Sequence, residues 1–340
     1  MAPTKLPLLV VFGATGSQGR SVITALQTSN NAAYRLRGLT SNQSSDAAKE
    51  LSKSGVEVVE VDIGSEASIY RAVEGAEVVF ANTVFPPDIF ASHGAAAAEE
   101  AESKTALRIA RAVAQIKTLK HLVWSTLPDA KKKTAGKLHI PHFQSKVAAV
   151  EFIRSQPELI KKTTMLSVGM YGSNLKNPGY VPVYDASIKR YVVKLPLRAD
   201  VSFSSIGDER KNIGVIVCAI LRSGEKTYDK WVVGEAHKTT MNKDVDALDK
   251  VVKEQLGIDK RVIFVETSLK DYEVVSGIFV TEKGPMFQYY ELQDDAFVDF
   301  GQDGKTLYPH ELGVTHAELA TVEDCLRSFD WQQILQGQRQ

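Results

Sequence analysis

The feature that most constrains this chain is a short apolar run that ends in a glycine-rich turn. Residues 8–12 are all apolar, and Gly13, Gly16 and Gly19 follow at regular spacing before a stretch of helical character. An unbroken apolar run of this length is typical of a strand buried on both faces of a parallel sheet. The first glycine permits a tight turn, the second lets backbone approach a ligand, and the third lets the next helix pack closely. That helix, expected from Gln18, directs unpaired N–H groups toward the turn, so the pattern predicts a site for the pyrophosphate of a dinucleotide.

The rest of the first half alternates between strand and helix signals. Strands are expected at residues 34–39, 56–61, 76–81, 121–125 and 163–168, and a helix is expected at 98–116. This order predicts an α/β fold of the Rossmann type, with a doubly wound parallel sheet. We expect the nucleotide-binding domain at residues 6–175 and a smaller mixed α/β subdomain at 176–335.

The second half carries mixed signals and a late aromatic cluster. Strands are expected at residues 228–233 and 261–265, and helices at 209–221 and 242–256. Aromatic side chains concentrate near the end of the chain and either line an apolar pocket or complete a small core. They are Phe279, Phe287, Tyr289, Tyr290, Phe297 and Phe300.

Composition excludes several classes of function. The 340 residues include 41 basic and 41 acidic side chains, so no net field attracts nucleic acid or an anionic membrane. Cys218 and Cys325 are the two cysteines, without the spacing of a metal site, and they indicate a reducing compartment. The N-terminal segment lacks the pattern of a signal peptide. We therefore expect a cytoplasmic protein, with a nuclear location also open, that binds neither a metal nor a membrane.

The end of the second expected strand favours NADP(H) over NAD(H). NAD-specific sites place an acidic residue there, but none occurs between Gly19 and Asp46. Arg37, together with donors such as Ser41, is expected to hold the 2′-phosphate. The alternative is that Arg37 is a solvent-facing strand residue.

Two further strand ends offer nucleotide contacts. Asp62, followed by Ile63, ends the third strand and is placed to accept a hydrogen bond from the adenine amino group, although it also suits a helix N-terminus. Asn82 and Thr83 end the fourth strand, where ligands of open α/β sheets bind.

A candidate catalytic group follows the fifth strand. Ser125 ends that strand, and His142 and Lys146 lie four residues apart, so that one helical face would carry both. Taken alone, such residues more often serve packing or solvation.

Together with residues 170–174, MYGSN, these motifs resemble the NmrA-like family of atypical short-chain dehydrogenases. The likeness covers most of residues 6–180, and the segment 131–146 most resembles NADPH-sensing members. The resemblance implies that Lys146 binds the nicotinamide ribose and that the second half forms one wall of the substrate cleft. It also implies two groups of nucleotide contacts: Gly13, Thr15, Gly16, Ser17 and Gln18 at the pyrophosphate, and Met170, Tyr171, Gly172 and Asn174 beside the nicotinamide.

Two departures from the family pattern affect the chemistry. Sensor relatives carry Arg where Ser41 stands, which weakens the argument for NADP(H). Typical dehydrogenases have a tyrosine acid where His142 stands. Because the ammonium of Lys146 disfavours an imidazolium nearby, His142 is expected to be mostly neutral near pH 7 and a poor replacement.

Two functions therefore remain open. The first is an NADPH-dependent oxidoreductase of metabolite biosynthesis that transfers hydride to an activated, small, apolar acceptor such as an enone, quinone or iminium. In it, Lys146 or Ser125 stabilises developing charge. The second is a non-catalytic transcriptional regulator that senses the redox state of the nucleotide and acts through a protein partner. A homodimer is compatible with both.

Overall fold

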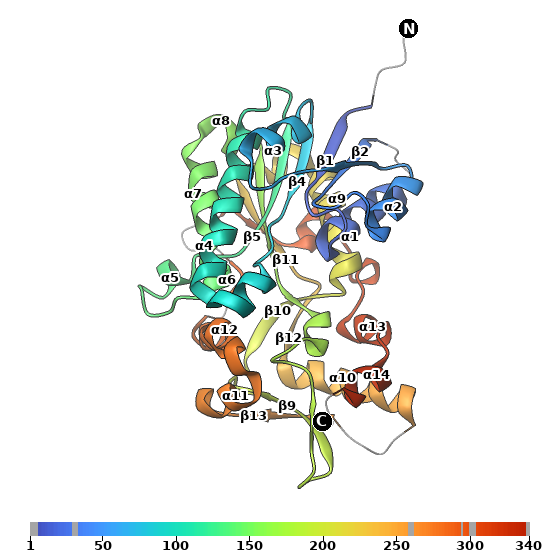
Figure 1. Ribbon diagram of the computed structural model, residues 1–340, viewed down its shortest axis with the longest axis vertical. Helices are drawn as coiled ribbons and strands as arrows, with labels where there is room; N and C mark the ends of the chain where they lie inside the picture. The colour runs from blue at the N-terminus through green and yellow to red at the C-terminus, as the bar shows by residue number, and fades with distance from the viewer. Residues whose placement is uncertain (1–5, 29–32, 258–261, 294, 299–303, 338–340) are drawn as a thin grey trace.

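The centre of the protein is an eight-stranded parallel sheet. The computed structural model describes residues 6–28, 33–257, 262–293, 295–298 and 304–337. The strand order is β14-β11-β6-β5-β4-β1-β2-β3, which confirms the expected Rossmann-type sheet (Figure 1). The strands are β1 (Leu8–Val11), β2 (Arg35–Thr40), β3 (Glu57–Glu60), β4 (Val78–Ala81), β5 (His121–Thr126), β6 (Thr163–Val168), β11 (Lys230–Gly234) and β14 (Thr306–Leu307).

Helices cover both faces of this sheet, and β1 shows why its sequence is apolar throughout. Leu8 and Val10 pack with one set of helices, whereas Leu9 and Val11 pack with another. Alternate residues of one strand therefore enter two separate cores. The first core includes α3 (Glu66–Val73), α4 (Pro87–Ala114) and α7 (Val147–Ser155), and the second includes α1 (Ser17–Thr28), α2 (Asp46–Lys53) and α9 (Glu209–Ser223).

The long helix α4 begins earlier than expected. Its first residue is Pro87 rather than a residue near 98, and Gly94 interrupts the helical backbone at φ 83°. Glycine adopts this left-handed conformation without steric cost, so the chain changes direction there and still continues as helix.

A mixed lower part lies beyond the carboxyl ends of the central strands (Figure 1). It contains two small sheets, ordered β12-β10-β7 and β13-β9-β8. Their strands are β7 (Met170–Tyr171), β8 (Val183–Asp185), β9 (Arg190–Leu195), β10 (Ser202–Gly207), β12 (His237–Thr240) and β13 (Val262–Glu266). Its helices are α10 (Met241–Leu256), α11 (Leu269–Ser276), α12 (Val280–Leu292), α13 (Val322–Arg327) and α14 (Trp331–Gln336). Three shorter helices lie between β5 and β6 in the sequence, namely α5 (Ala130–Lys133), α6 (Pro141–Gln144) and α8 (Pro157–Ile160).

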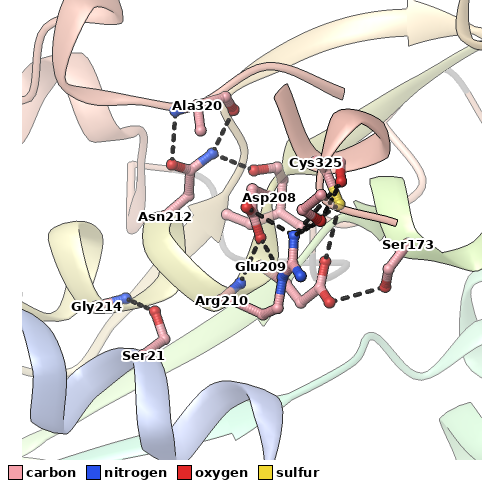
Figure 2. A network of polar contacts seen from close by, with 11 residues as sticks. Ser21, Ser173, Asp208, Glu209, Arg210, Asn212, Gly214, Ala320 and Cys325 are labelled. Atoms are coloured by element: carbon pink, nitrogen blue, oxygen red, sulfur yellow. Dashed lines mark hydrogen bonds and ion pairs between the residues drawn. The ribbon is translucent and has the colours of Figure 1, made fainter. Parts of the chain in front are cut away.

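Segments from both sides of the expected boundary at residue 175 contribute to the central sheet. Strands β11 and β14 lie beyond that residue, yet they extend the central sheet from β6. Helix α9 also returns and packs on α1, where a side chain at Gly214 would place its Cβ 2.1 Å from the backbone oxygen of Ser21. The Gly214 N–H donates to Ser21 Oγ at 2.8 Å (Figure 2). Segments before and after residue 175 therefore share one core.

The start of α9 also anchors the C-terminal segment. Arg210 binds Asp208 through two bonds of 2.9 and 3.0 Å, and its guanidinium also contacts Cys325 (Figure 2). Asp208, Glu209 and Cys325 offer ligand atoms within 4.8 Å of one another. Because Arg210 already supplies positive charge there, the cluster is explained as an anchor for α13. No described helix is both long and apolar enough to span a membrane.

Candidate active site

The glycine-rich turn has the backbone that its sequence predicts. Gly13 has φ +59°, in the left-handed region, and α1 begins at Ser17. A Cβ at Gly19 would lie 2.3 Å from the backbone oxygen of Gly13, which no real side chain tolerates. The N-terminus of α1 thereby reaches the carboxyl end of β1 with its free N–H groups directed at the turn.

A cavity of about 340 Å³, here called the turn cavity, lies beside this turn. The predicted nucleotide residues that line it are Gly13, Thr15, Ser41, Ile63, Asn82 and Thr83. Oδ1 of Asn82 and Oε1 of Gln18 are buried without a hydrogen-bond partner among the described residues. Buried polar atoms rarely stay unpaired, so these two atoms fit a polar ligand at the turn.

Arg37 does not lie where its predicted role requires. Its guanidinium donates to the backbone oxygen of Ala72 at 3.0 Å and pairs with Glu57 at 2.9 Å. Arg37 therefore caps the carboxyl end of α3 and is not among the described residues that line the turn cavity. The side chain is only 17% exposed, so it is not the solvent-facing residue of the alternative either. On β2 it points to the face of α3, whereas the cavity opens at the strand end.

Asp62 makes a contact in the turn before helix α3, close to the alternative that the sequence analysis gave for it. Its carboxylate accepts the N–H of Gly64 at 2.8 Å, which orders the turn before α3. The side chain is exposed, and the proposed bond to adenine stays a prediction.

A second cavity of about 260 Å³, the central cavity, adjoins the turn cavity through Thr83, which lines both. It brings together most of the predicted catalytic and nicotinamide residues, namely Ser125, His142, Lys146, Met170, Tyr171 and Asn174. Gln18, which was predicted at the pyrophosphate, lines it as well. Four other predicted contacts line neither cavity: Gly16, Ser17, Gly19 and Gly172. Gly172 packs against Gly207 and Cys325. The remaining wall comes from α12 and its surroundings, with Tyr180, Glu282, Lys283, Met286, Tyr290 and Phe297.

Lys146 is paired with a residue that the sequence analysis missed. Its Nζ lies 2.5 Å from Oε1 of Glu102 on α4, and Glu102 also accepts Ser145 Oγ at 2.5 Å and Thr83 Oγ1 at 2.6 Å. The Glu102 side chain is fully buried. Burial by itself would raise the pKa of Glu102, but the Lys146 ammonium and the three hydrogen bonds outweigh it and lower that pKa. Glu102 therefore stays charged and neutralises the lysine.

His142 has an acidic partner of its own. Its Nδ1 lies 2.8 Å from Oε1 of Glu282 on α12, and both side chains are nearly buried. Burial would raise the pKa of Glu282, but the nearby His142 lowers it overall. The expectation of a neutral His142 took only Lys146 into account and stays a prediction. The structure adds one carboxylate for each of the two basic groups.

His142 and Lys146 do not share a regular helix. His142 lies on α6, which ends at Gln144, whereas Lys146 occupies the position before the first residue of α7. Both side chains nevertheless line the central cavity, because the break between the helices turns them toward the same space.

Tyr171 and Gln18 form a hydrogen bond in the lining of the central cavity. Nε2 of Gln18 donates to the Tyr171 hydroxyl at 2.7 Å. Burial raises the pKa of Tyr171 well above its ordinary value, so this phenol stays neutral. It does not replace the tyrosine acid that is missing at position 142.

The late aromatic residues divide between the two expected roles. Phe287 and Tyr289 are fully buried in the core, while Tyr290 and Phe297 line the central cavity. Phe279 lines another cavity, described below. Phe300 lies outside the described residues.

Comparison with known proteins decides the family. The NmrA-like family profile matches residues 6–302. The chain belongs to the NmrA-like family. Relatives of this NmrA-like chain include the NmrA-like family domain-containing oxidoreductase notA′ of Aspergillus versicolor, which is 32% identical over 40% of this chain and 36% of its own length. An NmrA-like family domain-containing protein of Dictyostelium discoideum is 27% identical over 73% of this chain and 78% of its own length.

Solved structures share the fold of this NmrA-like protein. NmrA, a negative transcriptional regulator in complex with NADP, matches with a TM-score of 0.69 and 16% identity over 95% of each chain. The Citrobacter sp. triphenylmethane reductase complexed with NADP(H) matches with a TM-score of 0.66 and 16% identity, over 94% of this chain and 99% of the reductase.

Proposed function

We propose that this protein is an NADP(H)-dependent oxidoreductase that reduces an activated, small, mostly apolar acceptor in the biosynthesis of a metabolite. The observation that carries the proposal is an open central cavity that adjoins the turn cavity and holds a buried His142–Glu282 pair. A filled cavity would suit a protein that only senses the nucleotide. Support also comes from relatives named as oxidoreductases and from family folds solved with NADP or NADP(H).

The residues of the turn cavity fit a dinucleotide. Residues 13–18 and the start of α1 would hold its pyrophosphate, and the unpaired oxygens of Asn82 and Gln18 would accept its hydrogen-bond donors. Bound there, NADPH would supply the hydride for the reduction.

His142 is the proposed proton donor. An enone or quinone that accepts a hydride gains negative charge on oxygen, and that charge is quenched by a proton. Glu282 lies 2.8 Å from Nδ1 of His142, which leaves Nε2 as the atom that would give up its proton. Afterwards the imidazole regains a proton from solvent. The Glu282 carboxylate would thus hold the imidazole ring in place at the position where the usual tyrosine is missing.

Lys146 is the proposed positioning residue. Its bond to Glu102 makes the pair electrically neutral, and a second contact reaches Thr83 Oγ1 at 3.4 Å. An ammonium has three N–H donors, so one more is available to a ribose hydroxyl or to the acceptor oxygen. Lys146 therefore contributes hydrogen bonds rather than a proton.

The test follows NADPH oxidation by absorbance with a panel of quinones, enones and cyclic imines, and repeats it with NADH. We expect turnover with NADPH, with a decrease of roughly 100-fold or more in His142→Gln, the size typical of a lost general acid. Glu282→Gln should weaken the same step and move the pH profile, while Lys146→Met should abolish turnover.

His139 offers a matched control. It pairs with Glu99 at 2.6 Å but is half exposed and lies outside the described lining of the central cavity. His139→Gln should retain full activity. Tight NADPH binding without oxidation by any acceptor would contradict the proposal and favour the redox-sensing regulator. Equal rates in His142→Gln and the native protein would remove the assigned proton donor.

A further inference from the structure

We propose that the acceptor carries an acidic group, and that Lys283 binds this group where the central cavity meets a neighbouring outer cavity. The inference rests on the proposed function and names its substrate class as an acidic aromatic enone or quinone. The outer cavity has a volume of about 440 Å³, and its walls include Tyr180, Val183, Tyr184, Val192 and Phe279.

Lys283 differs from the other basic residues of the central cavity, His142 and Lys146, in its partners. Lys146 lies 2.5 Å from Glu102, and His142 lies 2.8 Å from Glu282. No described carboxylate lies within ion-pair distance of Lys283. Its Nζ donates to the backbone oxygen of Pro178 at 2.6 Å instead. Among the basic residues of the described cavity lining, Lys283 is therefore the one whose side chain has no carboxylate within ion-pair distance.

The surroundings of Lys283 make this charge costly. Nζ lies 4.6 Å from the ring centroids of both Tyr180 and Phe279. The two aromatic rings attract a cation but replace only part of its lost hydration. Consistent with that, burial lowers the pKa of Lys283 even though Glu282 nearby acts in the opposite direction. An anionic ligand would supply the missing countercharge.

Lys283 lies next to residues of both cavities. It lines the central cavity, Phe279 lines the outer one, and Tyr180 lines both. The partition between the two spaces therefore includes the ammonium and the two rings beside it. Gly179, at φ +83°, lies directly against the Lys283 side chain. A Cβ at this position would be 3.3 Å from Nζ, so the glycine leaves room for the ammonium. An acid group at this junction would leave the rest of an aromatic acceptor in the central cavity, next to His142.

The same charge selects among acceptors. A cationic iminium would face the ammonium of Lys283 in a poorly solvated space, which is unfavourable. A carboxylate or a phenolate would be attracted there and would form a charge-assisted hydrogen bond. Among the activated acceptors considered, the structure thus favours enones and quinones that carry an acid.

The test compares two probes that differ in one charge, 4-carboxychalcone and its methyl ester. Their affinities are measured by calorimetry with NADP⁺ present, so that no reduction occurs. We expect the acid to bind about tenfold more tightly than the ester, as one charge-assisted hydrogen bond implies. Lys283→Met should remove this preference, and Lys283→Arg should keep most of it.

Lys161→Met is the control, because Lys161 is an exposed lysine paired with Glu158 on α8. It should leave the preference unchanged, and thermal melts should show that every variant is folded. Equal affinities for the acid and the ester in the native protein, or an unchanged preference in Lys283→Met, would overturn the inference. The ester would still be reduced if the proposed function holds. Loss of the preference in Lys283→Met without any NADPH oxidation would support the anion site and contradict the oxidoreductase.

Discussion

Lys146→Met should destabilise the fold as well as stop turnover. The Glu102 side chain is fully buried and that of Lys146 is 13% exposed, so both charges are almost removed from water. Breaking such a pair typically costs about 3 to 5 kcal/mol, because the remaining charge is buried without compensation. Ser145 and Thr83 still donate to the carboxylate, and Glu102 also lines the turn cavity. We therefore expect the lower end, a loss of about 3 kcal/mol in the free energy of unfolding.

The pH dependence of this loss has a definite sign. In the native protein the pKa of Glu102 is lowered on folding, so its stabilising effect is present at neutral pH and fades as the pH falls through that pKa. Without Lys146, burial is the largest remaining influence and would raise the pKa of Glu102. The variant would then lose stability as the pH rises. The difference in stability between native protein and variant should therefore be larger at pH 7.5 than at pH 5.

Urea unfolding at these two pH values measures the effect. The double variant Lys146→Met/Glu102→Gln should be only about 1 kcal/mol less stable than the native protein, since the amide oxygen of the glutamine still accepts hydrogen bonds. Lys104→Met is the matched control on the same helix, where Lys104 and Glu100 form a largely exposed pair. It should cause no measurable change. A variant Lys146→Met as stable as the native protein at pH 7.5, or a difference that grows toward pH 5, would refute the reasoning.

Three further predictions concern other parts of the chain. Gly19→Ala should abolish dinucleotide binding in calorimetry, because its Cβ would meet the backbone oxygen of Gly13 at 2.3 Å and displace the helix; retained binding would contradict this. Burial raises the pKa of Asp244 to about 7, so native stability should fall as the pH rises from 4 toward 7. Asp244→Asn should flatten that part of the stability curve, and an unchanged curve would show that another group titrates. Arg37→Gln should lower the melting temperature, because Arg37 binds the backbone oxygen of Ala72. It should leave the ratio of NADPH to NADH affinity unchanged, and a changed ratio would restore the phosphate-binding role.

Local patterns predicted the elements of the nucleotide half well. The strand expected at residues 163–168 matches β6, Thr163–Val168, and the helix expected from Gln18 is α1, which starts one residue earlier. These elements depend on short-range periodicity and on glycine positions, which a single sequence displays directly. The domain boundary at residue 175 stays a prediction, and β11 and α9, which lie beyond it, pair and pack with segments far away in the sequence.

The partners of the candidate site could not be predicted in the same way. Glu102 lies in an alanine- and glutamate-rich helix, and Glu282 lies in a helix that carries no catalytic motif. A glutamate on a helix is normally exposed to solvent, so neither residue gave a signal in the sequence. The sequence around Arg37 also gave no sign that its guanidinium would cap the carboxyl end of α3 rather than face the end of its own strand.

The sequence by itself therefore determined the glycine-rich turn, the alternation of strand and helix, and the basic residues His142 and Lys146. Each of these depends on side chains that lie within a few residues of one another. Only the tertiary structure decided which charges meet. Glu102 reaches Lys146 across 44 residues, and Glu282 reaches His142 from helix α12. Because electrostatic interactions act through space and strengthen where water is excluded, the fold determines the chemistry of this site.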